Sequence, residues 1–126
     1  MTPEEWKAKI FQQRCWICGF NQATSQEWRW LEVHHIDRKG HSTVRADHPA
    51  NYFLACNVDH AGALVDMPHA MQLAYKLKHD PEHFDLEEWL RLRDHELMAP
   101  DRVTMEEVED CLDSLENEWR NGLRKN

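Results

Sequence analysis

Residues 52–60, Tyr-Phe-Leu-Ala-Cys-Asn-Val-Asp-His, contain the pattern that decides the fold of this 126-residue chain. Their first four residues form a short apolar run, which is typical of a strand buried in a core. A helix is expected to begin near Asn57, directly after Cys56. Cys56 and Asp59 stand three positions apart, so both side chains can reach one metal ion. The junction therefore predicts half of a metal site.

The other half is predicted upstream, where Cys15 and Cys18 repeat the same spacing. Zinc prefers four tetrahedral ligands drawn from Cys, His and Asp, so a structural zinc ion is predicted at Cys15, Cys18, Cys56 and Asp59. A cysteine is the more usual fourth ligand than Asp59. The alternative is that Cys56 packs in the core and no zinc binds. The 37 residues between the two pairs exceed the usual gap of a zinc ribbon and predict a functional insert.

The insert and the N-terminal region contain signals for a helix, a strand and a loop. Thr2-Pro3-Glu4-Glu5 is a capping box with proline at the first helical position, and the helix is expected to stop near Arg14. The segment from Glu27 to His35 is rich in Trp, Leu and Val and predicts a strand. Residues 37–50 predict a long polar loop.

The second half of the chain predicts helices. They are expected after Pro68, Asp85 and Thr104, and Gly122 can end the last one. Apolar residues recur at helical spacing along this last helix: Val108, Leu112, Leu115 and Trp119. The fold class is therefore α+β. We expect a core over residues 1–75 and an acidic helical extension over residues 76–126, packed on the same domain.

Charge is divided unevenly along the chain. The net charge is −8, which disfavours a nucleic-acid partner at first sight. Residues 1–60, however, hold seven basic and seven acidic residues, whereas residues 61–126 hold eight and sixteen. Any surface for DNA should therefore belong to the first half. The acidic helices, about residues 80–121, could instead dock on a basic protein partner.

Three of the nine histidines have positions that suggest chemistry. His34 and His35 close the first predicted strand, and His60 follows the second ligand pair. If one ion holds Cys15, Cys18 and Cys56 together, His60 comes close to the strand end that carries the other two.

The set of motifs resembles the HNH endonuclease family, in its zinc-braced bacterial and bacteriophage branch. The resemblance covers roughly residues 15–65 and depends on residues in a fixed order: Cys15-x-x-Cys18, Glu32-Val33-His34-His35-Ile36, Asn51 and Cys56-x-x-Asp59-His60. It implies a small ββα-metal core. Asp59 departs from the family pattern at a zinc position, whereas the catalytic positions are intact.

The resemblance also implies a role for each site residue. His34 and His60 would bind a catalytic divalent ion such as Mg²⁺, and His35 would be the general base that activates water. Asn51 would brace the loop and orient His35. These roles suit hydrolysis of DNA phosphodiester bonds, because a neutral imidazole can take a proton at cellular pH and a divalent ion can clamp the phosphate. Loop cations could hold flanking phosphates: Arg38, Lys39 and Arg45.

A non-catalytic zinc module that binds DNA or a protein partner is the alternative. It explains the cysteines but gives no reason for the histidines and Asn51 together. No apolar run is long enough to span a membrane, and the N-terminus does not resemble a signal peptide. A cytoplasmic location, in a bacterial cell or a phage-infected host, is therefore expected.

Overall fold

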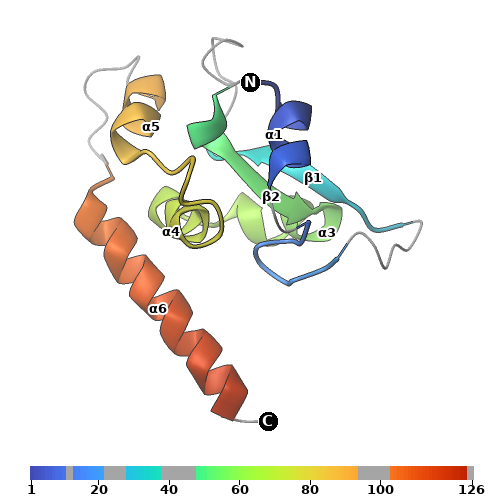
Figure 1. The fold of residues 1–126 in the computed structure, drawn as a ribbon. Helices are drawn as coiled ribbons and strands as arrows, with labels where there is room; N and C mark the ends of the chain where they lie inside the picture. Colours follow the sequence, from blue (N-terminus) through green and yellow to red (C-terminus); the bar gives the residue numbers. More distant parts are fainter. Residues whose placement is uncertain (11–12, 22–27, 38–47, 94–102, 125–126) are drawn as a thin grey trace.

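A computed structural model describes residues 1–10, 13–21, 28–37, 48–93 and 103–124, and of Arg93 and residues 119–124 it describes the backbone alone. Within these ranges the chain is α+β, with α-helices around a two-stranded antiparallel sheet (Figure 1). The elements in chain order are α1 (Pro3–Lys9), β1 (Leu31–His35), the 3₁₀ turn η2 (Pro49–Asn51), β2 (Tyr52–Cys56), α3 (Asn57–Ala61), the 3₁₀ turn η3 (Ala63–Val65), α4 (His69–His79), α5 (Leu86–Arg93) and α6 (Met105–Arg124).

The sheet confirms the predicted apolar strand and shortens the other one. Every residue of β2 is buried, as expected for a strand covered on both faces. In β1, which begins at Leu31 rather than Glu27, only the first residue is fully buried. The register pairs Leu31 with Cys56 and His35 with Tyr52, so the two histidines lie at the end of the sheet away from Cys56.

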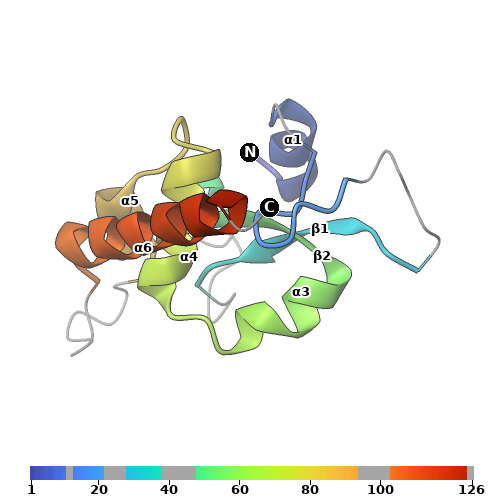
Figure 2. The same ribbon diagram turned by 90° about the horizontal axis from the view of Figure 1, so that it is seen from below.

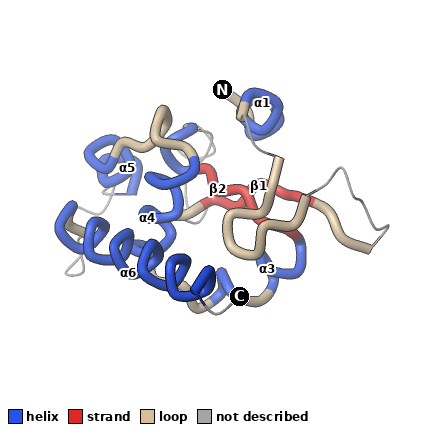
Figure 3. The backbone as a smooth tube through the Cα atoms, turned by 60° about the horizontal axis from the view of Figure 1, so that its bottom comes forward, coloured by secondary structure: helices blue, strands red, loops and turns tan. Residues whose placement is uncertain are grey.

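Helix α1 begins as predicted and ends early. Thr2 and Glu5 cap each other's backbone N–H groups, and Pro3 occupies the first turn. The helix ends at Lys9, before Arg14, and its one buried residue is Trp6. Figures 2 and 3 show α1 on one side of the sheet and α3 on the other.

The C-terminal helix belongs to the same core as the sheet. Helix α6 crosses α4, and Val108 and Leu115 are buried there (Figures 1 and 2). Leu112 is partly buried, and the side chain of Trp119 lies outside the described part of the structure. Gly122 does not end the helix, which continues to Arg124 because glycine weakens a helix without forbidding it.

A buried ion pair joins α1, η2 and α4. Lys76 in the last turn of α4 and Asp80, which caps that helix, approach within 2.7 Å, and both are almost fully buried. Lys76 also donates to the carbonyl of Pro49, and Trp6 Nε1 donates to Asp80 at 2.8 Å. Burial lowers the pKa of Lys76 to about 8. These bonds satisfy the charges that the fold has buried and fix α4 against the start of β2.

Among the helices of the described ranges, none has both the length and the apolar character needed to cross a bilayer.

Candidate functional site

The four predicted zinc ligands lie together. The candidate ligand atoms of Cys15, Cys18, Cys56 and Asp59 all lie within 4.8 Å of one another. Cys18 Sγ and Cys56 Sγ are 3.8 Å apart, and Asp59 Oδ2 lies 3.1 Å from Cys15 Sγ and 3.3 Å from Cys56 Sγ. Residues separated by more than 40 positions therefore form one cluster, which could bind a metal ion such as zinc.

The spacing of these atoms fits a tetrahedral ion. With Zn–S bonds of about 2.3 Å and Zn–O bonds of about 2.1 Å, two sulfurs would be about 3.8 Å apart and a sulfur and an oxygen about 3.6 Å apart. The observed sulfur–sulfur distance of 3.8 Å matches this value, whereas the two sulfur–oxygen distances, 3.3 and 3.1 Å, are shorter, as for hydrogen bonds from the thiols to Asp59. The Cys₃Asp set also has the soft ligands that favour zinc over magnesium.

Without a metal ion, the thiols of the cluster keep their protons and the carboxyl group of Asp59 is ionised more readily than usual. Burial raises the pKa of Cys15 to about 12 and raises that of Cys18 as well. Burial would also raise the pKa of Asp59, but hydrogen bonds from the three thiols outweigh it and lower that pKa below its ordinary value. A metal ion that binds here would displace the thiol protons, because cysteine binds metals as the thiolate.

Two local features shape the cluster. Gly19, with φ of +79°, lets the chain reverse after Cys18, and its N–H donates to the carbonyl of Cys15. Arg29 Nη2 lies 2.8 Å from Cys18 Sγ and 3.5 Å from Cys56 Sγ, and its guanidinium also covers the ring of Phe20. Arg29 is therefore placed to offset the negative charge of the thiolates.

A second site is a cavity of about 540 Å³ at the far end of β1. His34, His35 and His60 line it, together with residues of η3 and α4. The rings of His34 and His60 lie edge to face with centroids 4.8 Å apart, and His35 packs on Tyr52. Three of the four predicted catalytic residues thus share one cavity. The fourth, Asn51, is buried at the end of η2, directly before β2.

His34 is held in its neutral form. Burial lowers its pKa to about 4, against the opposing effect of a hydrogen bond to Gln72. Its Nε2 lies 2.9 Å from Gln72 Oε1. A neutral imidazole at physiological pH is the form that binds a metal ion.

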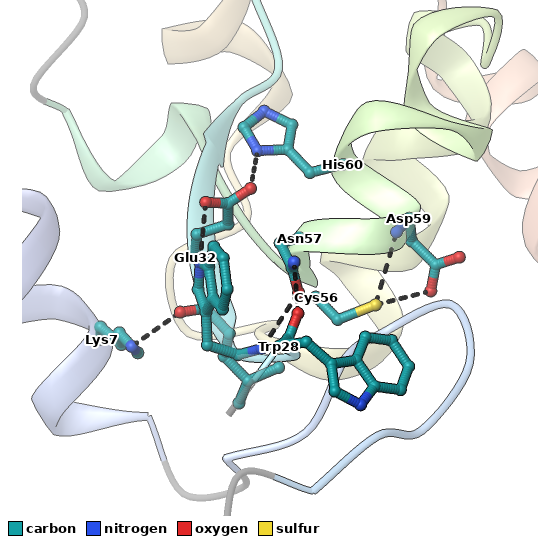
Figure 4. A network of polar contacts seen from close by, with 9 residues as sticks. Lys7, Trp28, Glu32, Cys56, Asn57, Asp59 and His60 are labelled. Atoms are coloured by element: carbon teal, nitrogen blue, oxygen red, sulfur yellow. Dashed lines mark hydrogen bonds and ion pairs between the residues drawn. The ribbon is translucent and has the colours of Figure 1, made fainter. Parts of the chain in front are cut away.

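His60 is held from the neighbouring strand. Its Nδ1 lies 2.7 Å from Glu32 Oε1, and Trp30 Nε1 lies 3.3 Å from the other oxygen of that carboxylate. Figure 4 shows that His60 and Asp59 project from the same short helix, α3, whose first turn is capped by Cys56. One helix therefore contributes a ligand to the Cys₃Asp cluster and a side chain to the histidine cavity.

Asn51 connects the segment after β1 to the core. Its Oδ1 accepts from the backbone N–H of Asp37 at 2.8 Å and from Trp89 Nε1 at 3.0 Å, and its Nδ2 donates to the carbonyl of Asp37. These bonds support a bracing role. Its predicted effect on the orientation of His35 stays a prediction.

Sequence reasoning missed three residues of the histidine site. Glu32 stood in the motif without a role, and Gln72 and His69, which both line the cavity, carried no signal because α4 brings them there from outside the motif. The loop cations predicted to contact phosphate lie outside the described residues: Arg38, Lys39 and Arg45.

No protein-family model, curated protein or solved structure matches this chain. The geometry of the two sites is therefore the basis for proposing a function.

Proposed function

We propose that this chain is a metal-dependent endonuclease of the HNH type that hydrolyses DNA phosphodiester bonds. The observation that carries the proposal is the shared cavity of His34, His35 and His60. The Cys₃Asp cluster supports it, because a structural zinc ion there would tie α3, and with it His60, and the end of β2 to the segment after α1.

Each residue would have one task. His34 and His60 would hold a divalent ion, which would neutralise the phosphate and stabilise the leaving oxygen. His35 would take the proton from the attacking water, a task for which imidazole is suited near neutral pH. Asn51 would hold the backbone of Asp37, two residues after β1, and so keep the strand end that carries His35 in place.

The test is cleavage of supercoiled plasmid by the zinc-loaded protein with Mg²⁺, Mn²⁺ or Ni²⁺. Nicked or linear product with wild type, absent for His34→Ala, is the expected result. The matched histidine control is His79→Phe, since His79 lines a different cavity. DNA binding without cleavage by any of the three metals would favour the non-catalytic zinc module instead.

A further inference from the structure

His34 and His60, whose rings meet edge to face in the cavity, each have a hydrogen-bond partner, but on different ring nitrogens. His60 is contacted through Nδ1 and His34 through Nε2. A neutral imidazole has one N–H donor and one lone-pair acceptor, so the nature of each partner decides which nitrogen carries the proton.

At His60 the partner can only accept. The Glu32 carboxylate has no proton to donate when ionised, and Trp30 Nε1, a donor only, already contacts its other oxygen. Nδ1 of His60 must therefore be the N–H donor at 2.7 Å from Glu32 Oε1. The lone pair of the neutral ring then resides on Nε2.

At His34 the same conclusion follows from a chain of two bonds. Gln72 is 3% exposed, and its Nε2 donates to the carbonyl of Met67 at 2.8 Å. A carbonyl only accepts, so the amide of Gln72 must present its oxygen to His34. Nε2 of His34 is then the donor, at 2.9 Å, and the lone pair resides on Nδ1.

We propose that Glu32 and Gln72 are positioning residues that fix the tautomers of His60 and His34, leaving Nε2 of His60 and Nδ1 of His34 to bind a divalent ion. The ion-binding part depends on the proposed function, whereas the tautomers do not. Partners of this kind raise ligand basicity and hold the ring in place, and their removal typically costs 10–100-fold in metal affinity. Gln72 on α4 and Glu32 on β1 would thus each orient one of the two histidines that bind the ion.

The test combines histidine NMR with metal titration of the zinc-loaded protein. Long-range ¹H–¹⁵N spectra of wild type near pH 8, without added Mn²⁺, should show the Nδ1–H form for His60 and the Nε2–H form for His34. Titration with Mn²⁺ alone should broaden both rings. Glu32→Ala should let His60 populate both tautomers and weaken Mn²⁺ binding by about 10–100-fold, and Glu87→Ala, which removes an exposed carboxylate on α5, should change neither.

Gln72 is buried, so its substitution needs a second readout. Gln72→Met keeps the length of the side chain and removes the acceptor. With this substitution His34 should populate both tautomers, whereas His60 should keep its Nδ1–H form. A general loss of fold would change both residues.

The opposite tautomers in wild type would overturn the proposal, and so would a Glu32→Ala protein with unaltered His60 spectra and Mn²⁺ affinity. Correct tautomers without any Mn²⁺ effect would instead refute the ion-binding part, and with it the metal role in the proposed function. A protein that binds Mn²⁺ as expected but cuts no DNA would leave the positioning roles supported and refute the nuclease proposal alone.

Discussion

Asp59 Oδ2 lies 3.1 Å from Cys15 Sγ, although 44 positions separate the two residues in sequence. The contact brings the loop after α1 to the first turn of α3, beside the half-buried His60. The position where the motif departs from a fourth cysteine is therefore one of the closest contacts of the cluster.

Asp59 should be a zinc ligand, and a weaker one than a cysteine at the same position would be. Protein purified without added zinc should contain about one zinc ion per chain. Asp59→Ala should weaken zinc binding by more than about 100-fold, because a lost ligand costs more than a lost outer partner. Asp59→Cys should slow zinc release, since a thiolate is the softer ligand. Chelator competition measures both, with Asp110→Asn, an exposed acid on α6, as control; equal zinc release from all four proteins would refute the role of Asp59.

Arg29 should increase zinc affinity without being a zinc ligand. A Cys₃Asp site with zinc carries a net charge of −2, and Arg29 lies 2.8 Å from Cys18 Sγ. Arg29→Gln keeps a donor but removes the charge, so zinc affinity should fall by about 10–100-fold, with faster alkylation of the thiols. Arg91→Gln, which removes an exposed arginine on α5, is the matched control. Identical zinc release rates for the two variants would contradict this assignment.

Helix α6 should be part of the folding unit. Leu115 is 9% exposed, in the same core as the sheet. Leu115→Ala should lower the free energy of unfolding by about 2–4 kcal/mol, whereas Met105→Ala, at a 36% exposed position of the same helix, should change it by less than about 0.5 kcal/mol. Denaturant unfolding measures both. Deletion of residues 105–126 should likewise destabilise the fold, and a truncated protein as stable as wild type would mean that α6 is an arm for a partner.

His79 should make stability depend on pH. Its ring stacks with the rings of Trp16 and Tyr75, and burial lowers its pKa to about 4, against the opposing effect of a backbone hydrogen bond to Trp16. In the unfolded chain the imidazole of His79 has a pKa of about 6.5, so below that pH it binds a proton that it does not bind in the folded chain. The contribution of His79 to the free energy of unfolding is therefore fully present above pH 6.5, and it is lost as the pH falls from 6.5 toward 4.

The measurement is the free energy of unfolding of wild type and His79→Phe at pH 7 and pH 5. Phenylalanine keeps a stacked ring and cannot titrate, so wild type should lose about 1–2 kcal/mol more than the variant after allowance for the partial exposure of His79. Zinc loss at acid pH affects both proteins and cancels in the difference. Parallel losses would show that His79 titrates normally.

Local sequence signals predicted the elements that depend on nearest neighbours. The Thr2 cap, the apolar run of β2 and the helix start at Asn57 are each specified within four or five residues, and all are found in the structure. The Cys₃Asp cluster was also predictable, because ligand spacing is a property of the chain. The structure confirms that the four side chains lie close together.

The missed features depend on tertiary packing. Lys76 and Asp80 have the spacing of an ordinary solvated pair on a helix, and only the positions of Trp6 and Pro49 show that they are buried. Gln72 likewise reaches His34 across 38 positions. Nothing in the local pattern of a polar residue states which distant group will cover it.

If the proposed mechanism holds, His35→Ala and His60→Ala should lose activity in different ways. As the proposed general base, His35 would contribute to turnover and not to ion binding, so His35→Ala should keep the fold, zinc and DNA affinity yet lose cleavage by about 10²–10⁴-fold. His60→Ala removes a proposed ion ligand, so its activity should recover in part at high Mn²⁺. Rate measurements over a range of Mn²⁺ concentrations separate the two, because excess ion can restore occupancy but cannot replace a base. His79→Phe controls for the loss of a histidine ring elsewhere. If wild type cuts DNA and His35→Ala cuts it equally well, the base is another group and the mechanism proposed for this cavity is wrong.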